Sequence, residues 1–149
     1  MTALLAIFAV CLWLTWCAPD GELAARIESE VARGPGTKFR LADLTEFEWE
    51  RVHLFGPYTS PETIEKTLGF SWCGSVRTEI QWSESITLLV FVKGDSVVRH
   101  VVLRRGRGDF AGLSMKSGTV AFTPKESAFE IREGDHGWIY VVLDQPGAR

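Results

Sequence analysis

Charged residues are absent from the first nineteen positions of this 149-residue sequence. The uncharged run from Ala3 to Cys17 is shorter than the ~20 apolar residues that span a bilayer as a helix, and it fits the ~7–15-residue apolar region of a signal peptide better. Lys and Arg are also missing before the run, and small residues do not mark a cleavage site. We therefore predict an exported protein. Residues 1–18 are either a signal peptide or a retained membrane anchor, unless the true start codon lies elsewhere.

Cysteine is scarce, with only Cys11, Cys17 and Cys73. The segment Leu14-Thr15-Trp16-Cys17 resembles the lipobox of bacterial lipoproteins, whose cysteine becomes the lipidated first residue of the mature chain, although Trp16 stands where that family has Gly, Ala or Ser. The resemblance implies lipidation of Cys17; the alternative is a cysteine that merely sits in an apolar segment. With Cys11 removed and Cys17 lipidated, Cys73 is left alone, so we expect no intramolecular disulfide and a domain held together by packing.

An excess of charge of one sign is missing too. The net charge of −3 comes from intermixed acidic and basic residues, which argues against a nucleic-acid partner and against binding to an anionic membrane surface. With 46% hydrophobic and 23% charged residues, the chain has the composition of one globular domain, and it contains no internal repeat. We divide it into residues 1–18 (signal peptide or anchor), 19–36 (N-terminal helix and linker) and 37–149 (a single α+β domain).

Two helices have clear local signals. Asp20 can cap a helix over residues 22–33, whose narrow apolar stripe would dock against a sheet; an unstructured spacer is the alternative. The stripe consists of Leu23, Ile27 and Val31. The second helix begins after Ser60, a good N-cap, with Pro61 at its first position, and ends at Gly69, which suits the left-handed C′ conformation.

The strand that precedes this second helix carries the first candidate site. Side chains alternate from Trp49 to Leu54, so we place Val52 and Leu54 in the core. Trp49, Arg51 and His53 then share the opposite face, which is a candidate binding surface.

Further strands follow from alternating apolar residues. We expect one strand over Ser75 to Trp82 and a hairpin of residues 86–93 and 96–103 around Gly94-Asp95, with Val92 opposite Val97 and Val90 opposite Arg99. Two apolar faces indicate that these hairpin strands are covered on both sides. Residues 119–123, 128–132 and 138–143 predict the last strands. The fold class is therefore α+β, with an antiparallel sheet of about five to seven strands, a short helix after the first strand and an N-terminal amphipathic helix.

The sequence contains no recognisable catalytic set and predicts no cofactor. His53, His100 and His136 lack the spacing of metal ligands, so we predict no metal site. Arg104, Arg105 and Arg107 form a basic loop that could meet an anionic partner such as an envelope polymer. A solvated loop without a ligand is the alternative.

One stretch resembles a known group. Residues 48–59, continued by residues 64–72, look like a group of small uncharacterised bacterial exported proteins and lipoproteins. In that group an acidic and aromatic lead-in and a Val-rich strand precede Phe-Gly/x-Pro-Tyr-Thr and a short helix that ends Leu/Ile-Gly-Phe/Tyr-x-Trp. The likeness covers about residues 45–73, implies no activity, and transfers no functional residue.

These observations favour an exported envelope protein, attached to the membrane through its N-terminus, that is a non-catalytic binding or structural module. Its expected partner is an envelope protein or an anionic polymer, and not a nucleic acid. The alternative is an extracytoplasmic hydrolase. A cleft that brings His53 or His100 against a carboxylate, a serine or Cys73 would favour the enzyme.

Overall fold

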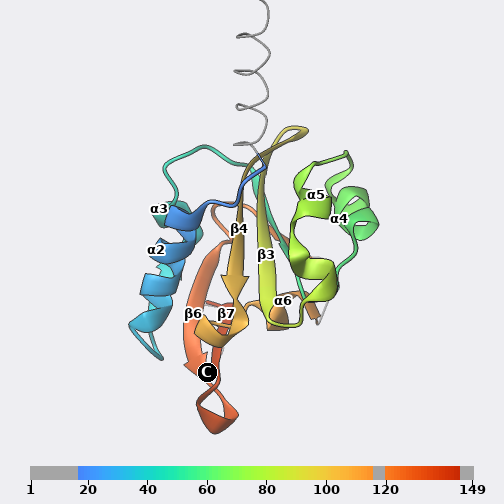
Figure 1. The fold of residues 1–149 in the computed structure, drawn as a ribbon. Helices are drawn as coiled ribbons and strands as arrows, with labels where there is room; N and C mark the ends of the chain where they lie inside the picture. Colours follow the sequence, from blue (N-terminus) through green and yellow to red (C-terminus); the bar gives the residue numbers. More distant parts are fainter. Residues whose placement is uncertain (1–16, 116–119, 145–149) are drawn as a thin grey trace, which may run out of the picture.

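The computed structural model describes residues 17–115 and 120–144, which form an α+β fold (Figure 1). Its seven strands make two antiparallel sheets, with the orders β4-β3-β2-β5 and β1-β6-β7. The α+β class is confirmed, although the strands divide between two sheets where we expected one. The strands are β1 (Lys38–Arg40), β2 (Arg51–Phe55), β3 (Ile86–Lys93), β4 (Ser96–Arg104), β5 (Val120–Phe122), β6 (Ala128–Glu133) and β7 (Ile139–Leu143).

Helices lie on both sides of the four-stranded sheet (Figure 1). The α-helices are α2 (Gly21–Ala32), α3 (Leu41–Leu44), α4 (Pro61–Leu68), α5 (Gly74–Arg77) and α6 (Ala111–Met115), and the 3-10 turns are η1 (Glu79–Trp82), η2 (Arg105–Arg107) and η3 (Asp135–Gly137). Helices α2 and α3 lie on one side of strands β3 and β4, and α4 and α5 on the other.

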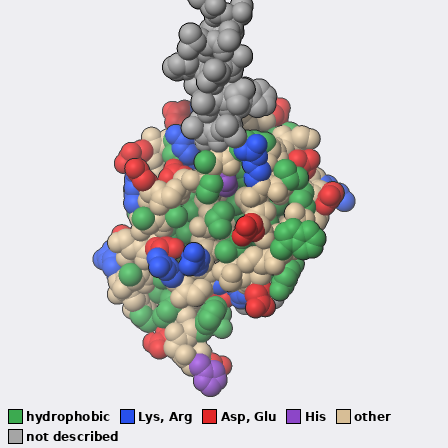
Figure 2. Space-filling view, viewed as in Figure 1, with side chains coloured by type: hydrophobic (Ala, Val, Ile, Leu, Met, Phe, Trp, Pro, Cys, Tyr) green, Lys and Arg blue, Asp and Glu red, His purple; other side chains and the backbone are tan. Residues whose placement is uncertain are grey.

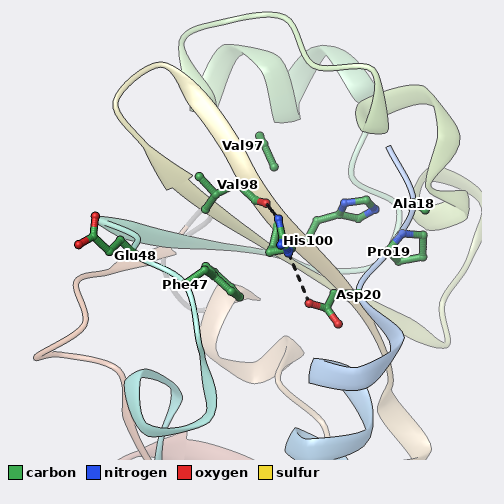
Figure 3. Close-up of a pocket in the computed structure, with 9 residues that line it drawn as sticks. Ala18, Pro19, Asp20, Phe47, Glu48, Val97, Val98 and His100 are labelled. Atoms are coloured by element: carbon green, nitrogen blue, oxygen red, sulfur yellow. Dashed lines mark hydrogen bonds and ion pairs between the residues drawn. The ribbon is translucent and has the colours of Figure 1, made fainter. Parts of the chain in front are cut away.

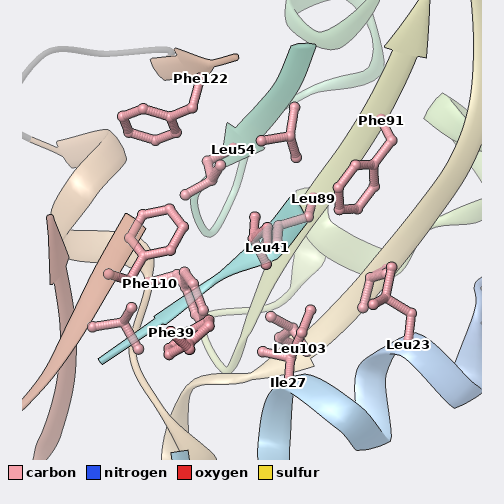
Figure 4. Close-up of a cluster of buried hydrophobic side chains, with 14 of the residues drawn as sticks. Leu23, Ile27, Phe39, Leu41, Leu54, Leu89, Phe91, Leu103, Phe110 and Phe122 are labelled. Carbon is pink, nitrogen blue, oxygen red and sulfur yellow. The ribbon is translucent and has the colours of Figure 1, made fainter. Parts of the chain in front are cut away.

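The larger core lies between α2, one face of the four-stranded sheet and the three-stranded sheet (Figure 4). Helix α2 begins where the sequence indicates, because the Asp20 carboxylate accepts a hydrogen bond from the Leu23 N–H at 2.9 Å. Its apolar stripe is buried in this core, which rules out a spacer. Val52 and Leu54 are fully buried in the same core, as predicted.

The smaller core fills the other face of the sheet, under α4, residues 70–72 and η1. Helix α4 has the predicted ends: the Ser60 hydroxyl accepts from the Thr63 N–H at 3.2 Å, and Gly69 adopts φ 83°. Its residue Ile64 packs against β3 residues in this core. The central strands are therefore covered on both faces, as their composition predicts.

The prediction of a strand over Ser75 to Trp82 is wrong. Residues 75–82 form α5 and η1 instead of a strand, and they leave Val76 66% and Trp82 80% exposed. Short-range bonds stabilise the turn, because the Ser75 hydroxyl lies 2.8 Å from the Trp72 carbonyl oxygen and 2.9 Å from a Glu65 carboxylate oxygen. Strand β1, which we did not predict from the sequence, is only three residues long, and Phe39 pairs with Phe129 across the sheet.

The hairpin register is also partly wrong. Val92 pairs with Val97 as predicted, but the register shifts between Phe91 and Val92, so that Val90 faces His100 and not Arg99. An extra residue in one strand reverses the face on which every later side chain lies. The shift turns His100 towards the smaller core and leaves Arg99 exposed on the other face.

Candidate functional site

A disulfide joins Cys17 to Cys73 across 56 positions of sequence, with their Cα atoms 6.2 Å apart. It ties the chain segment before α2 to the residue before α5. The two cysteines differ in exposure, because Cys17 is buried and Cys73 is exposed. The indole of Trp72 folds over Gly74, where a Cβ atom would lie 2.1 Å from a ring carbon. Residues 72–74 thus form a compact turn that only glycine at position 74 allows.

The expectation of no intramolecular disulfide is therefore wrong. It depended on lipidation of Cys17, which would have left Cys73 alone, and a thiol pairing between distant residues has no signal in one sequence. A sulfur in a disulfide cannot also carry the thioether of a lipid. Lipidation of the Cys17 sulfur and its disulfide with Cys73 therefore exclude each other.

A groove of about 660 Å³ lies beside this junction (Figure 3). Three segments line it: residues 18–20 before α2, residues 47–48 before β2, and residues 97–100 of β4. The Asp20 N–H donates to the His100 carbonyl at 2.8 Å, which fixes the first segment against the edge strand. The register shift in β4 places Val97 and Val98 at the groove, where they pack against the smaller and the larger core respectively.

Apolar and charged groups alternate along the groove. The Phe47 ring packs edge-on against Phe91, with centroids 5.4 Å apart, and the Arg99 guanidinium lies 5.4 Å from its centre. Arg99 also lies 3.7 Å from the Asp20 carboxylate, and Glu48 forms an ion pair with Lys93. Hydrogen bonding to Lys93, together with its charge, lowers the pKa of Glu48. The groove therefore combines apolar side chains with charges that are largely paired.

His100 is held by aromatic packing, without a hydrogen bond from its imidazole to another described side chain. Its imidazole is buried and packs edge-on against Trp72, with centroids 4.9 Å apart. Burial lowers the pKa of His100 to about 4, and the Asp20 carboxylate offsets this only in part. Within residues 17–115 and 120–144, no carboxylate, serine or cysteine hydrogen-bonds to the imidazole of His53 or His100. His100 and Asp20 do line the same groove, but no hydrogen bond joins the imidazole to the carboxylate.

The three residues Trp49, Arg51 and His53 do not form the single surface that was predicted, because Trp49 lies apart from the other two. Trp49 precedes β2 and turns into the larger core, where its ring lies 5.1 Å from that of Phe91 and its indole N–H donates to Thr45 at 3.0 Å. Arg51 and His53 do lie on the face of β2 opposite Val52 and Leu54, but they share it with Phe55, which is buried in the smaller core and stacks against His53. Burial, and then the charge of Arg51, lowers the pKa of His53. The structure keeps these two residues together on β2, and neither of them lines the groove described above.

The basic loop is mostly neutralised. Arg105 donates two hydrogen bonds to the buried Asp109 carboxylate, at 2.8 and 3.0 Å. Arg107 pairs with Glu28 of α2 at 2.7 Å. Of the three predicted cations, only Arg104 has no ionic partner among the described residues. The second reading, a loop without an anionic ligand, agrees better with these contacts.

The comparisons with known proteins add no relative. No protein-family model matches the chain, and no curated protein or solved structure matches it either. The described residues contain no cluster of three or more side chains suited to hold a metal ion. None of the described helices is long and apolar enough to cross a membrane, and the apolar run before Cys17 lies outside the described residues.

The groove is thus the feature that sequence reasoning missed. Its three segments are far apart in the chain, and the bulged register of β4 and the disulfide decide how they meet. The hydrophobic positions Val97 and Val98 gave a signal for a strand and none for a site. The exposed aromatic residues Tyr58 and Trp82 lie outside the groove, at η1. Figure 2 shows hydrophobic side chains on this side of the molecule, over α5 and η1.

Proposed function

We propose that this protein is exported and is a membrane-attached envelope module that binds an extended segment of another envelope protein in the groove of residues 18–20, 47–48 and 97–100. The Cys17–Cys73 disulfide carries the proposal. Disulfides persist in oxidising compartments and are rare in the cytosol. The pairing therefore supports export independently of the apolar N-terminal run and of the resemblance to exported proteins.

The position of Cys17 also bears on attachment. If its sulfur is paired with Cys73, the residue must stay in the mature chain, and any cleavage lies before it. Attachment would then depend on a retained apolar segment, and lipid on Cys17 is the alternative. Mass spectrometry of the N-terminal peptide from a membrane fraction separates the two: we expect a peptide crosslinked to the one that contains Cys73. A lipid mass on Cys17 would contradict this form of attachment.

The chemistry of the groove favours a protein partner. Phe47 and the two valines offer apolar contact, and the two carboxylates of the lining are each paired, Asp20 with Arg99 and Glu48 with Lys93. An anionic polymer would therefore meet no excess of positive charge there. An extended peptide can bury apolar side chains against Phe47 and the valines.

Site-specific photocrosslinking in intact cells tests the proposal. A photoreactive amino acid at Val98 should give a discrete protein adduct that is lost when Phe47→Ala removes the aromatic floor. Val142 of β7 is the matched control, because it is a half-buried valine outside the groove. The same adducts from both positions, or adducts only with lipid or polydisperse polymer, would refute the groove as a protein-binding site.

A further inference from the structure

The disulfide forms part of the groove. Residues 18 and 19 line one side of it and are exposed, and the structure shows no hydrogen bond from either residue to the rest of the described chain. They are held at both ends. On one side the Asp20 N–H donates to the His100 carbonyl, and on the other side Cys17 forms the disulfide with Cys73. The position of this wall therefore depends on a bond that can be reduced.

The two sulfurs are unequal targets for a thiol. Cys73 is exposed, at the start of α5, whereas Cys17 is only 7% exposed. Thiol–disulfide exchange requires the attacking thiolate to reach one sulfur in line with the bond that breaks. Attack is thus directed to the Cys73 sulfur, and Cys17 is the leaving thiolate.

The remainder of the domain is held by helix caps and core packing that do not depend on the disulfide. Helix α2 keeps its Asp20 cap and its buried stripe, and α4 keeps its own cap and Ile64 in the smaller core. None of these contacts includes a sulfur atom. Loss of the disulfide should therefore free residues 17–19 and leave the sheets in place.

We propose that the Cys17–Cys73 disulfide is a redox latch on the groove, closed when oxidised and opened by an extracytoplasmic dithiol protein. A thiolate of that protein attacks the Cys73 sulfur, and Cys17 leaves as a thiolate that takes up a proton. The second thiol of the partner then attacks its own sulfur in the mixed disulfide, which releases Cys73 as a thiol. Two electrons and two protons pass from the dithiol, which becomes a disulfide. The latch rests on the proposed function, because it regulates the same groove.

Hydrogen exchange read by mass spectrometry tests the latch on the full chain in detergent, with dithiothreitol as the probe dithiol and Cys11→Ser to remove the third thiol. On reduction, the amide of Asp20, which donates to the His100 carbonyl, should exchange about tenfold faster or more, while the amides of β3 and of the second half of α2 remain protected over the time in which Asp20 exchanges. In Cys73→Ser, the fast exchange should be present without reductant and should not respond to it.

Three results would overturn the latch: unchanged protection of the Asp20 amide after complete reduction, exchange of the β3 amides as fast as that of Asp20, or a disulfide that dithiothreitol does not reduce in the folded protein. The groove proposal fails separately. If photocrosslinking at Val98 captures no protein in either redox state while exchange changes as expected, the latch exists and the protein-binding function is wrong.

Discussion

Replacing Asp109 by asparagine removes the negative charge from a buried network and should destabilise the domain strongly. The Asp109 carboxylate is 3% exposed and accepts four hydrogen bonds. Two come from Arg105; the others come from the Ala111 N–H at 2.8 Å and the Trp138 indole at 3.0 Å. The backbone of Asp109 also bonds to β7, so this residue connects the end of β4 to the three-stranded sheet.

The size of the effect follows from burial. Removing one partner of a buried ion pair costs about 3–5 kcal/mol, because the other charge is left without compensation. Arg105 is 26% exposed and can turn partly to water, so we expect about 3 kcal/mol for Asp109→Asn. The matched control is Glu28→Gln, which breaks the more exposed pair with Arg107 and should cost about 0–1 kcal/mol.

The effect should depend on pH in a defined direction. Burial alone would raise the pKa of Asp109, but the hydrogen bonds from Arg105, Ala111 and Trp138 outweigh it and hold that pKa below its usual value. A carboxyl whose pKa is lower in the folded state stabilises the fold above its unfolded pKa of about 3.9. That stabilisation is lost as the pH falls through the folded pKa. The difference between wild type and Asp109→Asn should therefore shrink in acid.

Urea unfolding followed by tryptophan fluorescence, at pH 7 and at several acidic values, measures both quantities. Other carboxyl groups titrate alike in the two proteins and cancel in the difference. A cost at pH 7 no larger than that of Glu28→Gln would refute the role of this network. A cost that stays constant down to pH 2 would refute the assignment of the charge to Asp109.

Three further changes test the packing. Leu54→Asp buries an unpaired charge in the larger core and should unfold the domain, so an unchanged melting temperature would contradict its position. Gly74→Ala forces the Trp72 indole to move and should cost about 1–3 kcal/mol of unfolding free energy. In the control Gly112→Ala, the added Cβ atom meets nothing within 4 Å, so this variant should be neutral or slightly stabilised. Equal thermal stability of the two variants would argue against the close contact at Gly74. Cys73→Ser opens a loop of 56 positions and should lower the free energy of unfolding by about 4 kcal/mol in denaturant titrations under oxidising conditions, and a loss under 1 kcal/mol would mean that the bond does not form.

Local chemistry accounts for the parts of the fold that sequence could predict. Asp20 and Ser60 each place a helix start within one residue, because a cap needs only a side chain and an N–H three positions later. The alternation around Val52 and Leu54 identified the core face of β2 for the same reason. The α+β class followed from the order of such segments.

Non-local choices account for the failures. A single inserted residue near Val98 changes the face of the sheet on which His100 and Arg99 lie. The residue pattern of an apolar strand does not indicate such a bulge. Trp49 looked like the next step in an alternation, but it lies before the strand and turns into the core. The groove depends on both details, and on a disulfide between residues 56 positions apart, so the candidate site could not be predicted.

The disulfide also decides how the domain would respond to tension. Only three residues separate Cys17 from the first residue of α2, so a pull on the N-terminal side passes through the sulfur atoms to Cys73 and bypasses the hydrogen bonds of that helix. At ~3.4 Å per residue, the 56 positions between the cysteines hold roughly 190 Å of chain that cannot extend while the bond is intact. Stretching a single molecule from its ends should release that length only in the presence of a reductant. Mechanically, the first half of the domain is a closed ring, and a load on the N-terminus would fall on the elements after Cys73.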